Sequence, residues 1–211
     1  MTAPTKLKPI TSRSSRGRKF DAVLEGARAV FMRDGFEGAS VDDITRAAGV
    51  SKATVYSYFP DKREMFTEVT RRECERMAKT TLEEIDFSRA PREVMLRTAR
   101  NLTRFLLSDF SLQMFRICVA EAERFPDLGH AFYRNGPEMG RNRMVEYIKE
   151  AQARGELIES DPDMMAEQFA ELCKTRLWTR AVFGVQVTFS DEEIEEVSGE
   201  AVETMMARYE A

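Results

Sequence analysis

The fold is decided by residues 40–62, which read SVDDITRAAGVSKATVYSYFPDK. Ser40 and Ser51 each precede a short run with helical spacing, and both are good N-caps because a serine hydroxyl accepts a hydrogen bond from a free backbone amide. Gly49 ends the first run, since glycine tolerates the positive φ found just after a helix. Pro60 stops the second run. Two short helices joined by a turn containing glycine predict a helix-turn-helix, a motif that reads DNA.

The second short helix has a polar outer face. With Val55 and Phe59 pointing inward, the outer or flanking side chains supply a cation, hydroxyls, two tyrosines and a methyl group, from Lys52, Ala53, Thr54, Tyr56, Ser57 and Tyr58. Such groups near a helix N-terminus suit phosphates and the base edges of the major groove. The alternative is a capped surface hairpin with two half-buried tyrosines. The joint occurrence of both caps, the glycine and the aromatic run favours DNA recognition.

Residues 47–62 resemble the DNA-binding signature of the TetR (tetracycline repressor-like) family, and the resemblance begins near Arg18. Further along, residues 121–128 (EAERFPDL) and 132–137 (FYRNGP) are similar to the C-terminal domain of AefR-like members of that family. The resemblance implies an all-helical homodimeric transcriptional regulator. Such a regulator is usually a repressor, and a small apolar or amphipathic effector releases it from double-stranded DNA.

The resemblance also implies which side chains contact DNA, carried over position by position from the family's pattern. The side chains expected to face base edges are Lys52, Ala53 and Tyr56. Those expected to hold phosphates are Ser40, Arg46, Thr54, Tyr58 and Lys62. The helix after Asp61 would carry the effect of the ligand to the DNA-binding head. A ligand bound in the body would tilt this helix and so change the spacing of the two heads of the dimer.

Three parts are expected along the chain. Residues 1–16 carry several basic side chains and no acid, and are expected to form a disordered basic arm. This arm is either an inert tail or a segment that reaches the adjacent minor groove or backbone. Residues 17–72 are expected to form the helix-turn-helix DNA-binding domain, and residues 73–211 the helical ligand-sensing and dimerisation domain. The predicted fold class is all-α: a three-helix head joined by a bridging helix to a C-terminal bundle.

The remaining helices are predicted from apolar periodicity and from capping residues, since no alternating strand pattern occurs. The expected helices are 17–35, 62–85, 91–107, 109–125, 126–134, 138–153, 161–183 and a last one with a capping box at Ser190. The Gly136-Pro137 pair is expected to turn the chain. The helix over 109–125 is apolar on two sides, which predicts a place in the middle of the body.

The predicted helix over 161–183 raises a choice about two arginines. Arg176 and Arg180 fall within its apolar stripe, where an unpaired charge is costly to bury. Either they pair with carboxylates across a dimer interface, which we favour, or they present cations to an anionic ligand. The candidate effector contacts are Phe115, Cys118, Arg176 and Trp178. Ordinary core packing is the alternative explanation for the tryptophan and for the many methionines.

Charge is divided unevenly between the two ends of the chain. Residues 1–72 hold fourteen Lys and Arg against nine Asp and Glu, whereas the remainder holds eighteen against twenty-seven. A basic head on an acidic body suits an approach to phosphate from one end only. Cys74, Cys118 and Cys173 have no metal-like spacing and are predicted to be reduced core thiols, as is typical of a cytoplasmic protein.

The sequence supports no enzyme, metal centre or membrane span. His130 is the only histidine, and no glycine-rich phosphate loop follows a strand pattern. No apolar run approaches the roughly 18 residues of a spanning helix, and no cofactor is implied. The alternative function is a constitutive dimeric DNA-binding protein without an effector pocket, whose DNA affinity no ligand would change.

Overall fold

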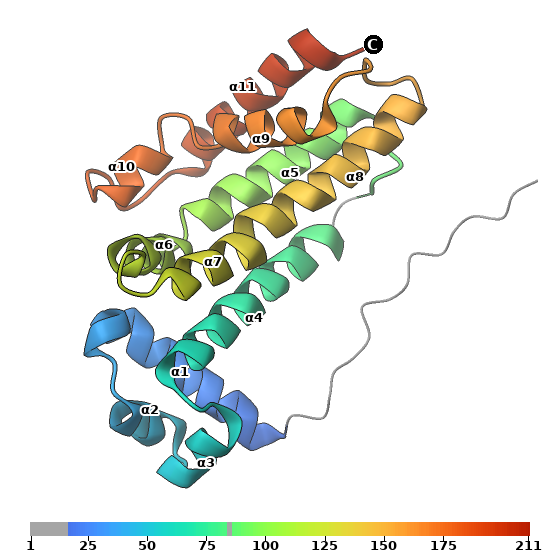
Figure 1. Cartoon of the computed structure of the whole chain (residues 1–211). Helices are drawn as coiled ribbons and strands as arrows, with labels where there is room; N and C mark the ends of the chain where they lie inside the picture. The colour runs from blue at the N-terminus through green and yellow to red at the C-terminus, as the bar shows by residue number, and fades with distance from the viewer. Residues whose placement is uncertain (1–16, 84–85) are drawn as a thin grey trace, which may run out of the picture.

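The computed structural model describes residues 17–83 and 86–211, and the regular elements within these ranges are helices (Figure 1). The prediction of an all-α fold is confirmed. In chain order the helices are α1 (Arg18–Gly38), α2 (Val41–Ala48), α3 (Lys52–Tyr58), α4 (Lys62–Glu83), α5 (Pro91–Leu106), α6 (Asp109–Glu121), α7 (Pro126–Tyr133), the π-helical turn η1 (Arg134–Glu138), α8 (Met139–Ala153), α9 (Pro162–Leu172), α10 (Trp178–Val182) and α11 (Asp191–Tyr209). The expected basic arm, residues 1–16, lies outside the described residues.

The two predicted N-caps of the helix-turn-helix are confirmed. The Ser40 hydroxyl accepts a hydrogen bond from the Asp43 amide at 3.1 Å, and the Ser51 hydroxyl accepts one from the Thr54 amide at 3.2 Å. Gly49 follows α2 with φ at 64°, in the left-handed region that glycine reaches without a steric penalty. These three residues fix where α2 ends and where α3 begins, and so fix the direction of α3.

The first helix lies directly against α2 at Gly26. A Cβ atom placed on Gly26 would lie 2.8 Å from the Ala48 backbone nitrogen and 2.9 Å from the Ala48 Cβ. Real Cβ atoms do not come that close to other atoms, so only glycine permits this approach. The helical periodicity of α1 gives no sign of this requirement, because it records which residues are apolar rather than how near a neighbouring backbone lies.

One hydrophobic cluster runs from the head into the body. Phe31 of α1 and Phe66 of α4 belong to the same cluster as Phe110 and Met114 of α6 and Leu128 of α7. The head formed by α1, α2 and α3 therefore shares its core with the α6–α7 corner, and α4 runs from the head alongside the body (Figure 1). A second cluster holds α5, α8, α9 and α11 together.

The predicted central position of the helix over 109–125 is wrong. Helix α6 ends at Glu121, and it packs against α1 and α7 at the junction of head and body. Val119 on its outer side is 60% exposed, and Ala122 just after the helix is exposed too. Val119 and Ala122 are thus apolar but not buried. The apolar pattern on two sides of the helix predicted more burial of α6 than the structure has.

The predicted turn at Gly136-Pro137 is also wrong. Helix α7 passes into η1 and then α8 with helical backbone throughout, so the chain continues instead of reversing. The π-helical turn accommodates Pro137, because its wider hydrogen-bonding pattern locally replaces the α-helical one that proline would interrupt. Asn135 donates a side-chain hydrogen bond to the Ala131 carbonyl at 2.8 Å across this turn.

The predicted continuous helix over 161–183 is broken. Helix α9 stops at Leu172, a series of turns follows, and Arg176 adopts a φ of 64° before the short helix α10 begins. The break places Leu177 in the interior, where it packs with Ile194 and Val197 of α11. The burial of Leu177 favours this arrangement, and neither glycine nor proline marks the break in the sequence. The predicted apolar stripe therefore does not continue beyond Cys173.

The three cysteines, Cys74, Cys118 and Cys173, are buried free thiols, as predicted. Burial raises the pKa of the Cys74 thiol to about 11, and it raises the pKa values of Cys118 and Cys173 to about 12. Among the described residues, no helix combines the length and the apolar character needed to cross a membrane.

Candidate DNA-binding surface and effector region

The outer face of α3 exposes the three side chains expected to reach base edges. Lys52 and Ala53 are exposed at the start of the helix, and Tyr56 one turn later is 48% exposed. The Lys52 ammonium lies 2.8 Å from the Asp42 carboxylate of α2, which raises the pKa of the lysine above its ordinary value. A base or phosphate that binds Lys52 must therefore compete with Asp42.

Two of the expected phosphate contacts lie at the exposed edges of the same surface. The Arg46 guanidinium near the end of α2 pairs with Asp43 at 2.6 Å, and its side chain is 77% exposed. Tyr58 at the end of α3 is 37% exposed, and the edge of its ring packs against the ring of Phe20 with the centroids 5.3 Å apart. Both polar groups remain accessible to a ligand that approaches α3.

The other three expected phosphate contacts already take part in hydrogen bonds that hold the head together. Ser40 caps α2, and its hydroxyl also donates to the Asp43 carboxylate at 2.6 Å. The Thr54 hydroxyl shares a 2.9 Å hydrogen bond with the Ser51 hydroxyl. Lys62 donates to the Glu37 and Ala39 carbonyls at 3.2 and 3.1 Å. An ammonium group has three donors, and these two carbonyls accept from two of them.

A joint between head and body forms where α1 ends. At Gly35 the backbone leaves the helix, with φ at 73°, and the turn that follows places Phe36 against Phe125 with ring centroids 5.3 Å apart. Glu37 pairs with Arg124 at 2.7 Å. The Lys62 ammonium lies 4.6 Å from the centroid of the Phe36 ring, so this joint also contacts the first residue of α4.

The candidate effector contacts do not form one site. Phe115 and Trp178 do meet, with ring centroids 5.1 Å apart and the planes at 70°. Cys118, one turn beyond Phe115, is buried, and its thiol lies 3.9 Å from the Leu128 carbonyl. Arg176 is exposed and lies in the turns before α10. An aromatic contact between α6 and α10 is therefore the part of this expected set that the structure brings together.

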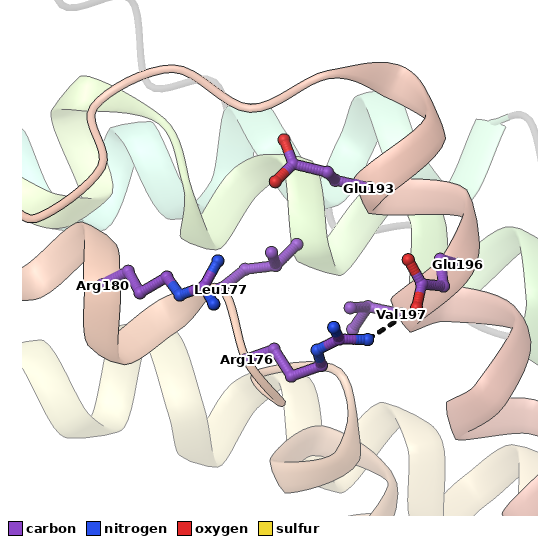
Figure 2. Close-up of a pocket in the computed structure, with 6 residues that line it drawn as sticks. All are labelled: Arg176, Leu177, Arg180, Glu193, Glu196 and Val197. Carbon is purple, nitrogen blue, oxygen red and sulfur yellow. Dashed lines mark hydrogen bonds and ion pairs between the residues drawn. The ribbon is translucent and has the colours of Figure 1, made fainter.

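The expectation that Arg176 and Arg180 occupy a buried stripe is wrong, because both side chains are exposed. Figure 2 shows them beside a shallow hollow, which is also lined by Leu177, Glu193, Glu196 and Val197. Arg176 pairs at 2.6 Å with Glu196 of the same chain. The hollow has a volume of about 40 Å³, enough for only a few water molecules.

Sequence reasoning missed two unpaired polar atoms in the body. Side-chain nitrogens of Asn101 and Arg143 are shielded from solvent and lack a hydrogen-bond partner among the described residues. The helical pattern of the sequence does not predict this, because it does not show which polar atoms find hydrogen-bond partners. No cluster of His, Cys, Asp and Glu in the described part of the chain could hold a metal ion.

Two family models match the chain. The model described as bacterial regulatory proteins, tetR family, matches residues 23–69. The model described as AefR-like transcriptional repressor, C-terminal domain, matches residues 93–211. The first match covers α2 and α3 with most of α1, and the second covers the body from α5 onward.

Curated relatives match a shorter part of the chain. The HTH-type transcriptional repressor AcnR of Corynebacterium efficiens is 36% identical over 83 residues, which are 39% of this chain and 40% of AcnR. AcnR of Corynebacterium diphtheriae is 32% identical over 75 residues, which are 36% of this chain and 40% of that protein. The chain thus spans about two fifths of the length of these curated relatives.

Solved structures match nearly the whole chain. A TetR-family transcriptional regulator from Mesorhizobium loti is 27% identical, with a TM-score of 0.83 over 95% of this chain and 100% of that one. The flavonoid-responsive regulator FrrA is 31% identical, with a TM-score of 0.76 over 92% of this chain and 98% of that one. These structures are similar in both the head and the body.

Proposed function

The chain belongs to the TetR family of bacterial regulatory proteins and has an AefR-like C-terminal domain, and from this we propose that it is a transcriptional repressor that a small molecule releases from DNA. The observation that carries the proposal is the outer face of α3, where Lys52, Ala53 and Tyr56 are exposed on a helix with a fixed N-cap. A helix N-terminus of this kind places donors against base edges in the major groove.

The relatives support both halves of the proposal. The AcnR proteins, whose names describe them as HTH-type transcriptional repressors, match part of the chain, which supports repression through DNA binding. FrrA is described as flavonoid-responsive and resembles the chain over head and body, which supports a response to a small apolar or amphipathic effector. A cytoplasmic location follows from this function, since the DNA target lies there.

The apolar surface near the end of the chain supports a homodimer. Phe183, Val185 and Val187, in the segment between α10 and α11, are 77%, 76% and 76% exposed. Three large apolar side chains exposed within five residues of one another suit an interaction site. A second copy of the chain would cover it and would supply the second head that a palindromic operator requires.

In the proposed mechanism, the body moves the head through two connections. Helix α4 leads directly from the helix-turn-helix into the body, and the joint of Phe36 with Phe125 connects the end of α1 to the α6–α7 corner. An effector that shifts the body would thereby change the spacing of the two α3 helices. On DNA that spacing is about 34–36 Å for half-sites one helical turn apart.

Selection of bound sequences from a random DNA pool tests the proposal with the full chain. We expect an enriched palindrome whose half-sites are one helical turn apart. Enrichment of no sequence would contradict operator binding. The constitutive alternative is tested by titrating the selected operator in the presence of compounds that raise the melting temperature. If stabilising compounds leave the DNA affinity unchanged, the chain is a constitutive binder.

A further inference from the structure

Resting on the operator binding proposed above, we propose that Asp42 of α2 is a specificity-determining residue of the DNA-binding surface. Together with Lys52 of α3 it selects a G·C base pair in each half-site. The lysine binds the acceptors of guanine, and the carboxylate accepts a hydrogen bond from the cytosine amine. The inference rests on the geometry of the Lys52–Asp42 pair, on its exposure beside Tyr56, and on the contacts of the neighbouring Asp43.

The pair joins the first turns of α2 and α3. Asp42 is the second residue of α2 and Lys52 the first residue of α3, and the Lys52 Nζ atom lies 2.8 Å from the Asp42 Oδ1 atom. The Lys52 side chain is 52% exposed and the Asp42 side chain 67%. Tyr56, four positions after Lys52, projects from the same side of α3 and is exposed as well. The carboxylate therefore lies on the same accessible surface as the groups expected to face base edges.

The local structure of α2 does not account for the Asp42 carboxylate. The capping contacts belong to Asp43, which accepts a hydrogen bond from the Ser40 hydroxyl and pairs with Arg46. In the part of the chain that the structure describes, the side-chain partner of Asp42 is Lys52, and an exposed ion pair contributes little to stability. A carboxylate that approaches DNA is repelled by the phosphates. A hydrogen-bond donor on the DNA offsets that repulsion.

A G·C pair supplies such a donor next to the acceptors that suit Lys52. In the major groove, guanine presents the adjacent acceptors N7 and O6, and cytosine presents its N4 amine. Guanine O6 and cytosine N4 are about 2.9 Å apart because they hydrogen-bond with each other. This spacing matches the 2.8 Å between Lys52 Nζ and Asp42 Oδ1. When Lys52 turns to guanine, the cytosine amine takes its place beside Asp42, whereas a phosphate that takes Lys52 leaves Asp42 without a donor.

An A·T pair matches the two side chains less well. Its acceptors, adenine N7 and thymine O4, lie on either side of the adenine amine. An ammonium group therefore meets one acceptor at an A·T pair instead of the two adjacent ones of guanine. The order of two acceptors followed by a donor is found at G·C, and it is the order that a lysine beside a carboxylate can satisfy.

Removal of the cytosine amine alone tests the inference. The base 2-pyrimidinone lacks this amine and keeps the ring, so a duplex that carries it opposite guanine retains the guanine acceptors. Fluorescence anisotropy would compare the selected operator with duplexes in which each cytosine of one half-site is replaced in turn. We expect one replacement to weaken binding of the wild-type chain about fivefold or more, the lower end of the discrimination that one base-edge contact provides.

Asp42→Ala should bind this amine-free duplex as well as it binds the selected operator. Asp21→Ala is the matched control, because Asp21 is also exposed and pairs with an arginine of the head, Arg72, at 2.7 Å. It should lose as much affinity as the wild-type chain on removal of the amine. The melting temperature of Asp42→Ala should equal that of the wild-type chain, since the ion pair it removes is exposed.

Two results would overturn the inference: a wild-type chain that is insensitive to every replacement, or a loss of affinity that Asp42→Ala shares. If Asp42 only held Lys52 in place, Asp42→Ala would change the affinity for all duplexes alike and would remain sensitive to the amine. The proposed function is tested separately by the selection itself. If the wild-type chain selects no operator, the proposed function fails. If it selects one and binds every amine-free duplex equally well, the inference alone fails.

Discussion

Lys52 and Lys62 illustrate how single side chains on the head divide between the proposed DNA contacts and stabilising the fold. The Lys52 ammonium meets only a neighbouring carboxylate among the described residues, and that carboxylate, on Asp42, is itself exposed. The Lys62 ammonium meets two backbone carbonyls and an aromatic ring. Exposed ion pairs contribute little to stability because water competes for both charges. Lys52 is therefore available to a ligand, whereas the contacts of Lys62 also stabilise the fold of the head.

Lys52→Ala should weaken binding to the selected operator by about 1–3 kcal/mol, if the side chain contacts a base edge as proposed. Asp42→Asn should have the opposite effect, because it removes the carboxylate that Lys52 must leave when DNA binds. Fluorescence anisotropy with the operator and with a scrambled duplex measures both. An operator affinity unaffected by Lys52→Ala would exclude this orientation of α3.

Lys62→Ala should lower the melting temperature as well as the DNA affinity. Hydrogen bonds to a charged group contribute about 1.5–3 kcal/mol, and Lys62 makes two of them to the Glu37 and Ala39 carbonyls. Arg63→Ala is the control, since Arg63 is the exposed next residue and pairs only with nearby Asp61 among the described residues. A melting temperature of Lys62→Ala equal to that of the wild-type chain would mean that the hydrogen bonds to the two carbonyls do not stabilise the head. Lys62 would then contribute only to phosphate binding.

Residue-level prediction from sequence succeeded where a local rule decides the outcome, and failed where a distant contact decides it. The caps at Ser40 and Ser51 follow from the nearest few residues and are confirmed. The exposed state of Arg176 follows from the packing of Leu177 against α11, which no local pattern contains. The unpaired state of Arg143 likewise depends on what surrounds it in three dimensions.

At the scale of elements, the head depends on a close approach of α1 to α2 and on the joint that ties α1 to the body. Most helix boundaries were predictable, because caps, prolines and apolar spacing mark them. The π-helical turn through Pro137 and the break after α9 were not, since a continued helix and a broken one carry the same apolar residues here. The outer side of α6, expected to be buried, is exposed because an apolar pattern does not show whether another element covers it.

Gly26→Ala should destabilise the head, because the new methyl group would overlap the Ala48 backbone and force α1 away from α2. Overpacking of this kind costs about 1–3 kcal/mol. Gly140→Ala is the matched control on α8, where a Cβ meets nothing within 4 Å. That substitution should instead stabilise by up to about 1 kcal/mol through helix propensity. Urea unfolding of both variants, followed by circular dichroism, measures the difference, and equal effects would contradict the close contact.

Phe125→Ala should loosen the joint between body and head without unfolding either. It removes the ring that packs on Phe36, and we expect faster amide hydrogen exchange in residues 36–39. Val119→Ala, on the exposed side of α6, should leave that exchange unchanged. If both variants exchange like the wild-type chain, the ring contact does not hold the joint, and α4 would be the remaining connection.

At the scale of the whole molecule, the hydrophobic core continues from head to body while three thiols lie buried within the fold. Because α6 and α7 supply part of the interior of the head, we expect that the head does not fold stably without the body. The domain boundary predicted at residue 72 follows the charge pattern and the helix-turn-helix motif. The hydrophobic packing, by contrast, joins residues on both sides of that position.

Alkaline pH should destabilise the molecule through its thiols. The pKa of an unfolded cysteine is about 8.5, whereas Cys74 titrates at about 11 and Cys173 at about 12 in the folded chain. A pKa raised by folding gives stability that is complete below the unfolded pKa and is lost as pH rises towards the folded one. The free energy of urea unfolding should therefore fall between about pH 8.5 and 11. Cys173→Ala should flatten that fall, and an unchanged slope would contradict the prediction.

The same burial makes the chain suitable for site-directed spin labelling without first removing its native cysteines. A maleimide or nitroxide reagent requires an accessible thiolate, and none of the three thiols is accessible in the folded chain. Ser57→Cys on the exposed side of α3 would then be the one reactive position in each subunit. In a homodimer, the two nitroxides would report the distance between the reading helices directly, and pulsed dipolar spectroscopy could follow that distance as DNA or effector is added.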